Sequence, residues 1–131
     1  MKLYIIRHGE TKLNALGRLQ GWTDEPLNKS GRDLAVITGE ALKKVPFDLV
    51  ITSPLKRARE TGELAVAASE TFFGKKVPVI EDRRLMEFNW GSWEGLCCLE
   101  SNFEIPDPNY NSFYTDPFHY QGAPDGESVA D

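Results

Sequence analysis

The sequence lacks the features that would place the chain in a membrane, outside the cell or on nucleic acid. No apolar run approaches the roughly 18 residues of a membrane span, and the apolar run 3–6 is shorter than the roughly seven residues of a signal peptide. Lysine and arginine number 15 against 20 aspartates and glutamates, giving a net charge of −5. This balance argues against nucleic acid or an anionic membrane as the main partner. We therefore expect a cytoplasmic protein, and a small anionic substrate stays compatible with the charge.

Cysteine is scarce, and the only two, Cys97 and Cys98, are adjacent. An adjacent pair is neither a disulfide framework nor a metal motif with spaced ligands. We expect two buried or half-buried thiols in a reducing compartment. Nothing in the pattern calls for a metal ion or a cofactor.

What is present indicates one α/β domain over residues 1–131. Runs of strand-forming residues occupy 3–6, 47–52 and 77–80. The first run is unbroken and apolar, which predicts a strand buried on both faces of a parallel sheet. Helical patterns alternate with these runs, as they do in α/β domains with parallel sheets.

Two helices are expected between the strands. Ser30 is a candidate cap for the first, with Asp33 three residues later. An apolar stripe at helical spacing follows, made of Leu34, Ile37, Ala41, Leu42 and Val45. Ser53 and Pro54 predict the start of the second helix, whose apolar positions are Leu55, Ala58, Ala65 and Ala68.

The character of the sequence changes after Leu96. Residues 97–124 combine aromatic side chains with several prolines and show no clear period. This pattern indicates an irregular insertion or lid within the domain, or an insertion that packs its aromatic rings on the body of the protein. Residues 124–131 resemble the beginning of a helix, so we expect the domain to continue beyond residue 131.

Two of the predicted strands end in residues suited to phosphate chemistry. The first ends in Arg7 and His8, and the second leads into a helix whose first turns carry Lys56, Arg57 and Arg59. Cations are disfavoured at a helix N-terminus, and a bound anion would remove that conflict, although these side chains can also extend into water. Ligands bind beyond the carboxyl ends of parallel strands, so both junctions would lie at one edge of the sheet.

An imidazole between two guanidiniums can perform phosphoryl transfer. Arg7 and Arg57 can bind phosphate oxygens in pairs, while His8 attacks phosphorus in line. A lone histidine is more often structural, so the prediction rests on the two junctions together.

The motifs resemble those of the histidine phosphatase superfamily, which includes the cofactor-dependent phosphoglycerate mutases. The resemblance lies in four segments that occur in the family's order: RHGETKLN at 7–14, RLQGWTDEPL at 18–27, TSPLKRARET at 52–61 and LMEFNWGSWEG at 85–95. It implies a three-layer α/β/α sandwich with a mostly parallel sheet, of the phosphoglycerate mutase-like type and incomplete at the C-terminus.

The resemblance also implies roles for individual residues. His8 would accept the phosphoryl group, and Glu87 would donate a proton to the leaving oxygen. The expected substrate-binding residues are Arg7, Arg57, Asn14, Gln20 and Gly21. The implied reaction is hydrolysis of a small phosphate monoester through a phosphohistidine, without a metal ion.

Two departures from the family pattern leave alternatives open. Phe88 and Asn89 follow Glu87, where the mutases have a basic residue and a tyrosine-glycine pair, so the context favours a phosphatase over a mutase. The family's second histidine has no counterpart here, because His119 follows no apolar strand. A non-catalytic phosphate-binding domain is the remaining alternative, and self-association is left open.

Overall fold

The computed structural model describes all residues from Met1 to Asp131. The chain forms two compact units. The first unit comprises Met1–Lys12 and Asp24–Met86, and the second comprises Leu13–Thr23 and Glu87–Asp131. A short helix, α1 (Lys12–Ala15), lies where the chain passes from the first unit into the second.

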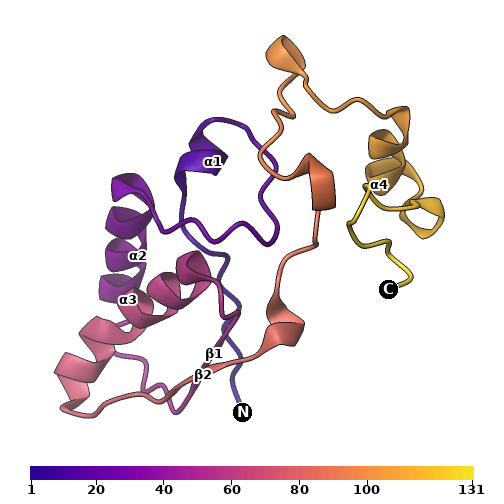
Figure 1. Cartoon of the computed structure of the whole chain (residues 1–131). Helices are drawn as coiled ribbons and strands as arrows, with labels where there is room; N and C mark the ends of the chain where they lie inside the picture. The colour runs from indigo at the N-terminus through magenta and orange to yellow at the C-terminus, as the bar shows by residue number, and fades with distance from the viewer. The chain divides into compact units, whose positions relative to one another are not determined.

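The first unit is built on a parallel strand pair crossed by a helix. Strands β1 (Val50–Thr52) and β2 (Val79–Glu81) pair in parallel, with Ile51 opposite Ile80. Helix α3 (Lys56–Phe73) connects them, and helix α2 (Lys29–Ala41) packs along α3 (Figure 1). The expected α/β class with a parallel sheet is therefore confirmed. The strand expectations for 47–52 and 77–80 are each confirmed in part, because only the last residues of each run are extended and paired.

The strand expected at residues 3–6 is absent, and that prediction is wrong. No residue of this run pairs with the sheet, and Leu3 and Ile5 are 76% and 88% exposed. A strand is stabilised by hydrogen bonds to a neighbouring strand, and the apolar character of the run does not supply that neighbour. The run instead leads, as extended chain, into Arg7 and His8.

Helix α2 is capped by a different residue from the one expected. The side chain of Asn28 accepts a hydrogen bond from the Gly31 backbone N–H at 2.8 Å, so Asn28 is the N-cap in place of Ser30. Asparagine is among the best N-cap residues, because its short side chain reaches the unpaired N–H groups of the first turn.

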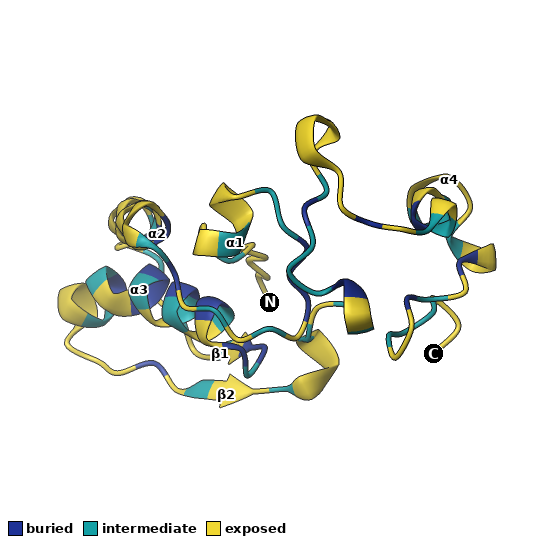
Figure 2. Cartoon of the chain, turned by 45° about the horizontal axis from the view of Figure 1, so that its top comes forward, coloured by how far each residue is buried: buried dark blue, intermediate teal, exposed yellow.

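The buried face of α2 is also different from the expected apolar stripe. Its buried residues are Gly31, Ala35 and Gly39, spaced four apart. Leu34 and Ile37 are 59% and 64% exposed, and most of α2 is coloured as exposed in Figure 2. These small residues allow close backbone contacts: a Cβ atom on Gly39 would lie 2.6 Å from the Leu64 carbonyl oxygen of α3, and one on Gly31 would collide with the Glu10 carbonyl. The two contacts decide which face of α2 is turned inward. Leu34 and Ile37 lie outside these close contacts and stay largely exposed.

Helix α3 begins later than expected and has no side-chain cap of its own. Ser53 accepts a hydrogen bond from the Leu55 N–H at 3.3 Å, within the turn that precedes the helix. The carboxylate of Asp24 accepts from the Lys56 N–H at 2.7 Å, which satisfies one donor of the first turn from outside the helix. Gly74, at φ 62°, ends the helix in the left-handed conformation that favours glycine.

The second unit is irregular and is held by an aromatic core. It contains α4 (Ser112–Thr115) and short 3₁₀ helices at Gly91–Trp93, Glu100–Asn102, Pro108–Asn111 and Pro117–His119. The buried cluster consists of Leu19, Trp90, Trp93, Ile105, Tyr110, Tyr120 and Ala123. Ring contacts inside it include Trp93–Tyr110 and Trp93–Tyr120. Packing of large rings therefore takes the place of regular secondary structure in ordering this part of the chain.

The structure also bears on the cysteines, on segment 124–131 and on the lack of a membrane-spanning helix. Cys97 is buried and Cys98 is half-buried, both as free thiols, as expected. The helix start expected at 124–131 is wrong, because this segment forms turns and Asp125 has φ 59°. None of the helices combines the length and the apolar character that crossing a bilayer requires.

Candidate functional site

The segment that carries His8 is anchored from both helices of the first unit. The buried Gly9 N–H donates to Thr61 Oγ1 on α3 at 2.9 Å. The Thr61 hydroxyl in turn donates to the Arg57 carbonyl at 2.7 Å. The Asn28 N–H donates to the Glu10 carbonyl at 2.9 Å, immediately before α2 begins. The backbone around His8 is thus fixed by polar contacts from residues 18 to 52 positions away in the sequence.

Two glycines allow this segment to pack directly on the start of α2. A Cβ atom on Gly9 would lie 2.6 Å from the Gly31 carbonyl oxygen, and one on Gly31 would collide with the Glu10 carbonyl. Both obstacles are backbone atoms, which cannot move aside as a flexible side chain can. The glycine after His8 is therefore required by the close approach of two backbone segments.

The hydrogen bond of the His8 ring determines which nitrogen carries the lone pair. Nδ1 of the half-buried His8 lies 2.7 Å from the Gly9 carbonyl oxygen. A carbonyl only accepts, so this contact requires a proton on Nδ1. In the neutral ring the lone pair is then on Nε2. An imidazole fixed in this tautomer has its nucleophilic nitrogen at the far side of the ring from the backbone contact.

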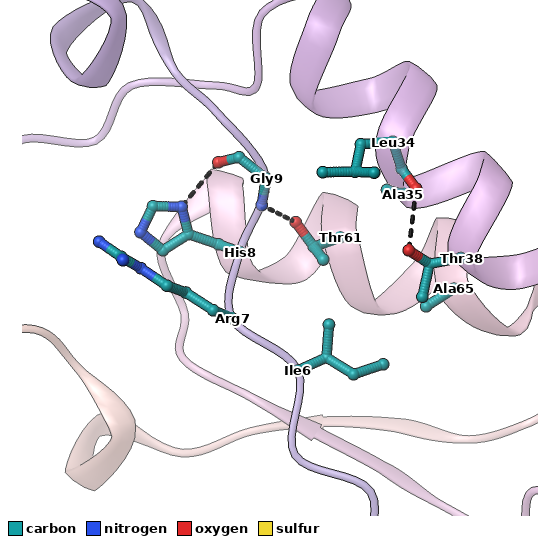
Figure 3. Close-up of a pocket in the computed structure, with 9 residues that line it drawn as sticks. All are labelled: Ile6, Arg7, His8, Gly9, Leu34, Ala35, Thr38, Thr61 and Ala65. Atoms are coloured by element: carbon teal, nitrogen blue, oxygen red, sulfur yellow. Dashed lines mark hydrogen bonds between the residues drawn. The ribbon is translucent and has the colours of Figure 1, made fainter.

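The two arginines expected to bind phosphate, Arg7 and Arg57, have very different exposures. Arg7 is exposed, and Figure 3 shows its side chain extending to the same side of the chain as the His8 ring. Arg57, in the first turn of α3, is only 1% exposed. Arginine is almost never buried to this degree without polar partners, so Arg57 marks a polar interior at the N-terminal end of α3.

A small pocket of about 60 Å³ lies behind the His8 segment (Figure 3). Residues 6–9 form one wall, and α2 and α3 form the other through Leu34, Ala35, Thr38, Thr61 and Ala65. The Thr38 hydroxyl donates to the Leu34 carbonyl at 2.9 Å, and Thr61 is engaged as described above. This helical wall is apolar apart from hydroxyls that are already bonded, so it is unsuited to an anion.

The basic residues at the start of α3 are compensated in part by carboxylates. Arg59 Nε donates to Glu63 at 2.8 Å, and Arg59 also pairs with Glu81 of β2. These hydrogen bonds raise the pKa of Arg59 above its ordinary value. The expected conflict with the helix dipole is therefore relieved at Arg59 without any bound anion, whereas Arg57 is the cation that the fold buries.

The remaining expected site residues belong to the second unit. Gln20 and Gly21 are buried, while Asn14, in α1, is exposed. Glu87 is exposed, and its Oε1 accepts from the Phe88 N–H at 2.9 Å. The indole N–H of Trp22 donates to the Glu87 carbonyl at 3.0 Å. The structure thus brings the loop that carries Gln20 and Gly21 against the segment that carries Glu87.

His119 lies at the surface of the second unit. Its side chain is 81% exposed, and its Nδ1 contacts Asp116 Oδ2 at 2.8 Å within one turn of 3₁₀ helix. No group of three or more histidine, cysteine, aspartate or glutamate side chains in residues 1–131 could hold a metal ion.

Comparison with known proteins decides the family. A model of the histidine phosphatase superfamily (branch 1) matches residues 3–131. The chain belongs to this superfamily. The uncharacterized phosphatase PhoE of Bacillus subtilis is 37% identical to it over 111 residues, which cover 85% of this chain and 54% of PhoE.

Solved structures of similar proteins share its fold. YhfR of Bacillus stearothermophilus superposes with a TM-score of 0.78 at 37% identity, covering 95% of this chain and 58% of YhfR. A phosphoglycerate mutase from Bacillus anthracis gives 0.61 at 38% identity, covering 67% of this chain and 37% of the mutase. The expected phosphoglycerate mutase-like α/β fold is thereby confirmed. The chain spans little more than half the length of PhoE and of YhfR.

Several residues that organise this histidine phosphatase chain were not identified from the sequence. Asn28, Gly31 and Thr61 position the His8 segment, and Glu94 binds the loop after Gln20. Thr61 and Glu94 lie inside the recognised motifs, but nothing in the local pattern distinguishes them from neighbouring polar residues. Their roles depend on contacts with residues far away in the sequence.

Proposed function

We propose that this chain hydrolyses a small phosphate monoester, with His8 as the phosphoryl acceptor. The observation that carries the proposal is the hydrogen bond from His8 Nδ1 to the Gly9 carbonyl, at 2.7 Å. It leaves the lone pair on Nε2, the form that a nucleophile requires. Membership of a superfamily of phosphatases and mutases supports the same chemistry.

The proposed reaction has two steps. In the first, Nε2 of His8 bonds to phosphorus while the bond from phosphorus to the ester oxygen breaks, and the leaving oxygen takes a proton. In the second, water attacks the phosphohistidine and gives a proton back to the group that donated one in the first step. The bond from nitrogen to phosphorus breaks, its electron pair returns to Nε2 of His8, and inorganic phosphate is released. Positioned cations stabilise the charge on the transferring group, and a positioned acid makes an alkoxide a better leaving group.

We assign the residues of this reaction as follows. Arg7 and Arg57 would bind the phosphate oxygens, and the burial of Arg57 favours a fixed guanidinium. Glu87, whose exposure leaves it accessible, would donate the proton. Asn14, Gln20 and Gly21 would form further substrate contacts, an assignment that rests on the family resemblance.

A second candidate is phosphoryl transfer of the phosphoglycerate mutase type. It is favoured by the likeness to the mutase from Bacillus anthracis at 38% identity. The residues after Glu87 favour the phosphatase, because they lack the basic residue and the tyrosine-glycine pair of the mutases. A non-catalytic phosphate-binding domain is the third candidate, and it follows from the surface position of His119.

Trapping of the intermediate separates these candidates. The purified chain is mixed with a radiolabelled phosphate monoester, quenched and tested for an acid-labile, base-stable phosphoramidate. We expect label in the parent protein and in the control His119→Ala, and none in His8→Ala. Label that persists in His8→Ala would contradict the proposed acceptor, and phosphate binding without label or turnover would favour the non-catalytic domain. Transfer of label to 3-phosphoglycerate in preference to water would favour the mutase.

We further propose a cytoplasmic setting, no role for nucleic acid and self-association of the chain. The net charge of −5 supports the first two. Self-association is supported by the exposure of large apolar side chains on the first unit, including Leu3, Ile5, Leu34 and Ile37. Sedimentation velocity over a range of protein concentrations tests it, and a monomer at all concentrations would contradict it.

A further inference from the structure

One carboxylate in the second unit, that of Glu94, accepts hydrogen bonds from three donors of the loop that follows Gln20. Glu94 Oε1 accepts from the Trp22 N–H at 2.8 Å, and Oε2 accepts from the Thr23 hydroxyl at 2.7 Å. The Gly21 N–H lies 3.1 and 3.0 Å from the two oxygens. The Trp90 N–H also donates to Oε1, at 3.3 Å. A half-buried carboxylate that accepts this many hydrogen bonds fixes the groups around it, because bonds to a charged acceptor are stronger than neutral ones.

The same loop is tied to the Glu87 segment by two further contacts. The Trp22 indole N–H donates to the Glu87 carbonyl at 3.0 Å. A Cβ atom on Gly21 would collide with the Phe88 carbonyl, so the two backbones touch at this point. Residues 20–23 belong to no helix or strand that could hold them in this position. Their conformation therefore depends on these side-chain and backbone contacts.

We propose that Glu94 is a positioning residue, which holds the loop of Gly21 against the segment of Glu87. The inference rests on the proposed function, in which Gly21 contacts the substrate and Glu87 donates the proton. In this role Glu94 acts through the loop and not by contact with the substrate. It links the two segments because its carboxylate accepts from Gly21 and Trp22 on one side and from Trp90 on the other.

This role predicts how far turnover falls when the carboxylate of Glu94 is removed. A displacement of about 1 Å at a site can reduce turnover by roughly 100-fold, even though the altered residue makes no contact with the chemistry. Glu94→Ala should therefore lower kcat/KM by about 10- to 100-fold. Glu94→Gln, which keeps the shape and one acceptor oxygen, should lose less. A purely structural contribution would lower the stability of the protein without this graded effect on turnover.

Nuclear magnetic resonance gives a test that does not depend on activity. The backbone amide signals of Gly21 and Trp22 and the indole signal of Trp22 are followed in ¹⁵N-labelled parent, Glu94→Gln and Glu94→Ala. The matched control is Glu104→Gln, which removes a carboxylate of the same unit that accepts from the Cys97 N–H at 2.8 Å. We expect the three signals to shift in both Glu94 variants and to stay in place in the control.

The two readouts separate failure of this inference from failure of the proposed function. Unchanged loop signals in Glu94→Ala and Glu94→Gln, or equal shifts in Glu104→Gln, would overturn the positioning role whatever the activity. Shifted signals with turnover equal to the parent would also overturn it. A parent protein with no turnover would contradict the proposed function, while the signals would still decide whether Glu94 orders the loop.

Discussion

Replacing Thr61 by valine removes the hydroxyl group that holds the His8 segment and tests the importance of that contact. Valine keeps the shape of threonine but has no oxygen, so the buried Gly9 N–H loses the acceptor that lies at 2.9 Å. A buried donor left without a partner costs about 1–3 kcal/mol. The variant also removes the hydrogen bond from the Thr61 hydroxyl to the Arg57 carbonyl, at 2.7 Å. That carbonyl lies within α3, where the backbone N–H four residues later is its regular partner, so the Gly9 N–H is the group that is left without a partner.

The expected magnitude is within reach of ordinary unfolding measurements. A loss of about 1–3 kcal/mol raises the ratio of unfolded to folded protein roughly 5- to 150-fold at 25 °C. For a domain of this size each kcal/mol lowers the melting temperature by roughly 3–5 °C. Thr61→Ser is the matched control: it keeps the hydroxyl and loses one methyl group, at a cost of about 0.8 kcal/mol.

Two assays together identify the cause of any destabilisation. Urea unfolding gives the free energy of unfolding of the parent and both variants. Hydrogen exchange reports the Gly9 amide directly, which we expect to be protected in the parent and in Thr61→Ser and to exchange faster in Thr61→Val. An equally slow Gly9 amide in Thr61→Val, or an unfolding free energy within error of the parent, would refute this account of the segment.

Three further predictions follow from individual groups. Glu87→Gln should slow the hydrolysis of alkyl phosphates far more than that of activated aryl phosphates, and equal losses measured on both substrates would argue for a binding or structural role. Hydrogen bonds from Arg84 lower the pKa of Asp82 from 3.8 to about 2, so Asp82 should stabilise the fold above about pH 4 and lose that contribution as the pH falls towards 2. Asp82→Asn should reduce the decrease in the free energy of unfolding between about pH 4 and pH 2, and an unchanged decrease would contradict the assignment. Chelator treatment should leave phosphate binding and turnover at the level of the untreated protein, measured by calorimetry and product release; a strict need for a divalent ion would refute the proposed mechanism.

The motif-level features of the chain could be predicted because they depend on short stretches of sequence. The segments around His8, Arg57 and Glu87 identify the superfamily, and the alternation of strand and helix patterns indicates an α/β fold with a parallel sheet. Gly9 and Gly21 lie within the recognised motifs. Each of these features is encoded by residues close together in the chain, so no knowledge of distant contacts is needed to recognise it.

The helix faces could not be predicted in the same way. Hydrophobic periodicity pointed to Leu34 and Ile37 as the buried side of α2, yet the helix turns Gly31 and Ala35 inward. Periodicity records where large apolar residues recur, whereas the close approach of α2 to α3 is decided by where small residues allow backbones to meet. The same limitation explains why residues 3–6 look like a strand and yet join none.

The residues that build the candidate site depend on contacts across long stretches of sequence. Thr61 reaches Gly9 across 52 positions, and Glu94 reaches Trp22 across 72. The local sequence specifies that a histidine follows an apolar run and that a glutamate precedes a glycine. Only folding brings an acceptor to the Gly9 amide, fixes the proton of His8 on Nδ1 and gathers the donors of one loop around a single carboxylate, because each hydrogen bond requires two groups that the chain alone leaves far apart.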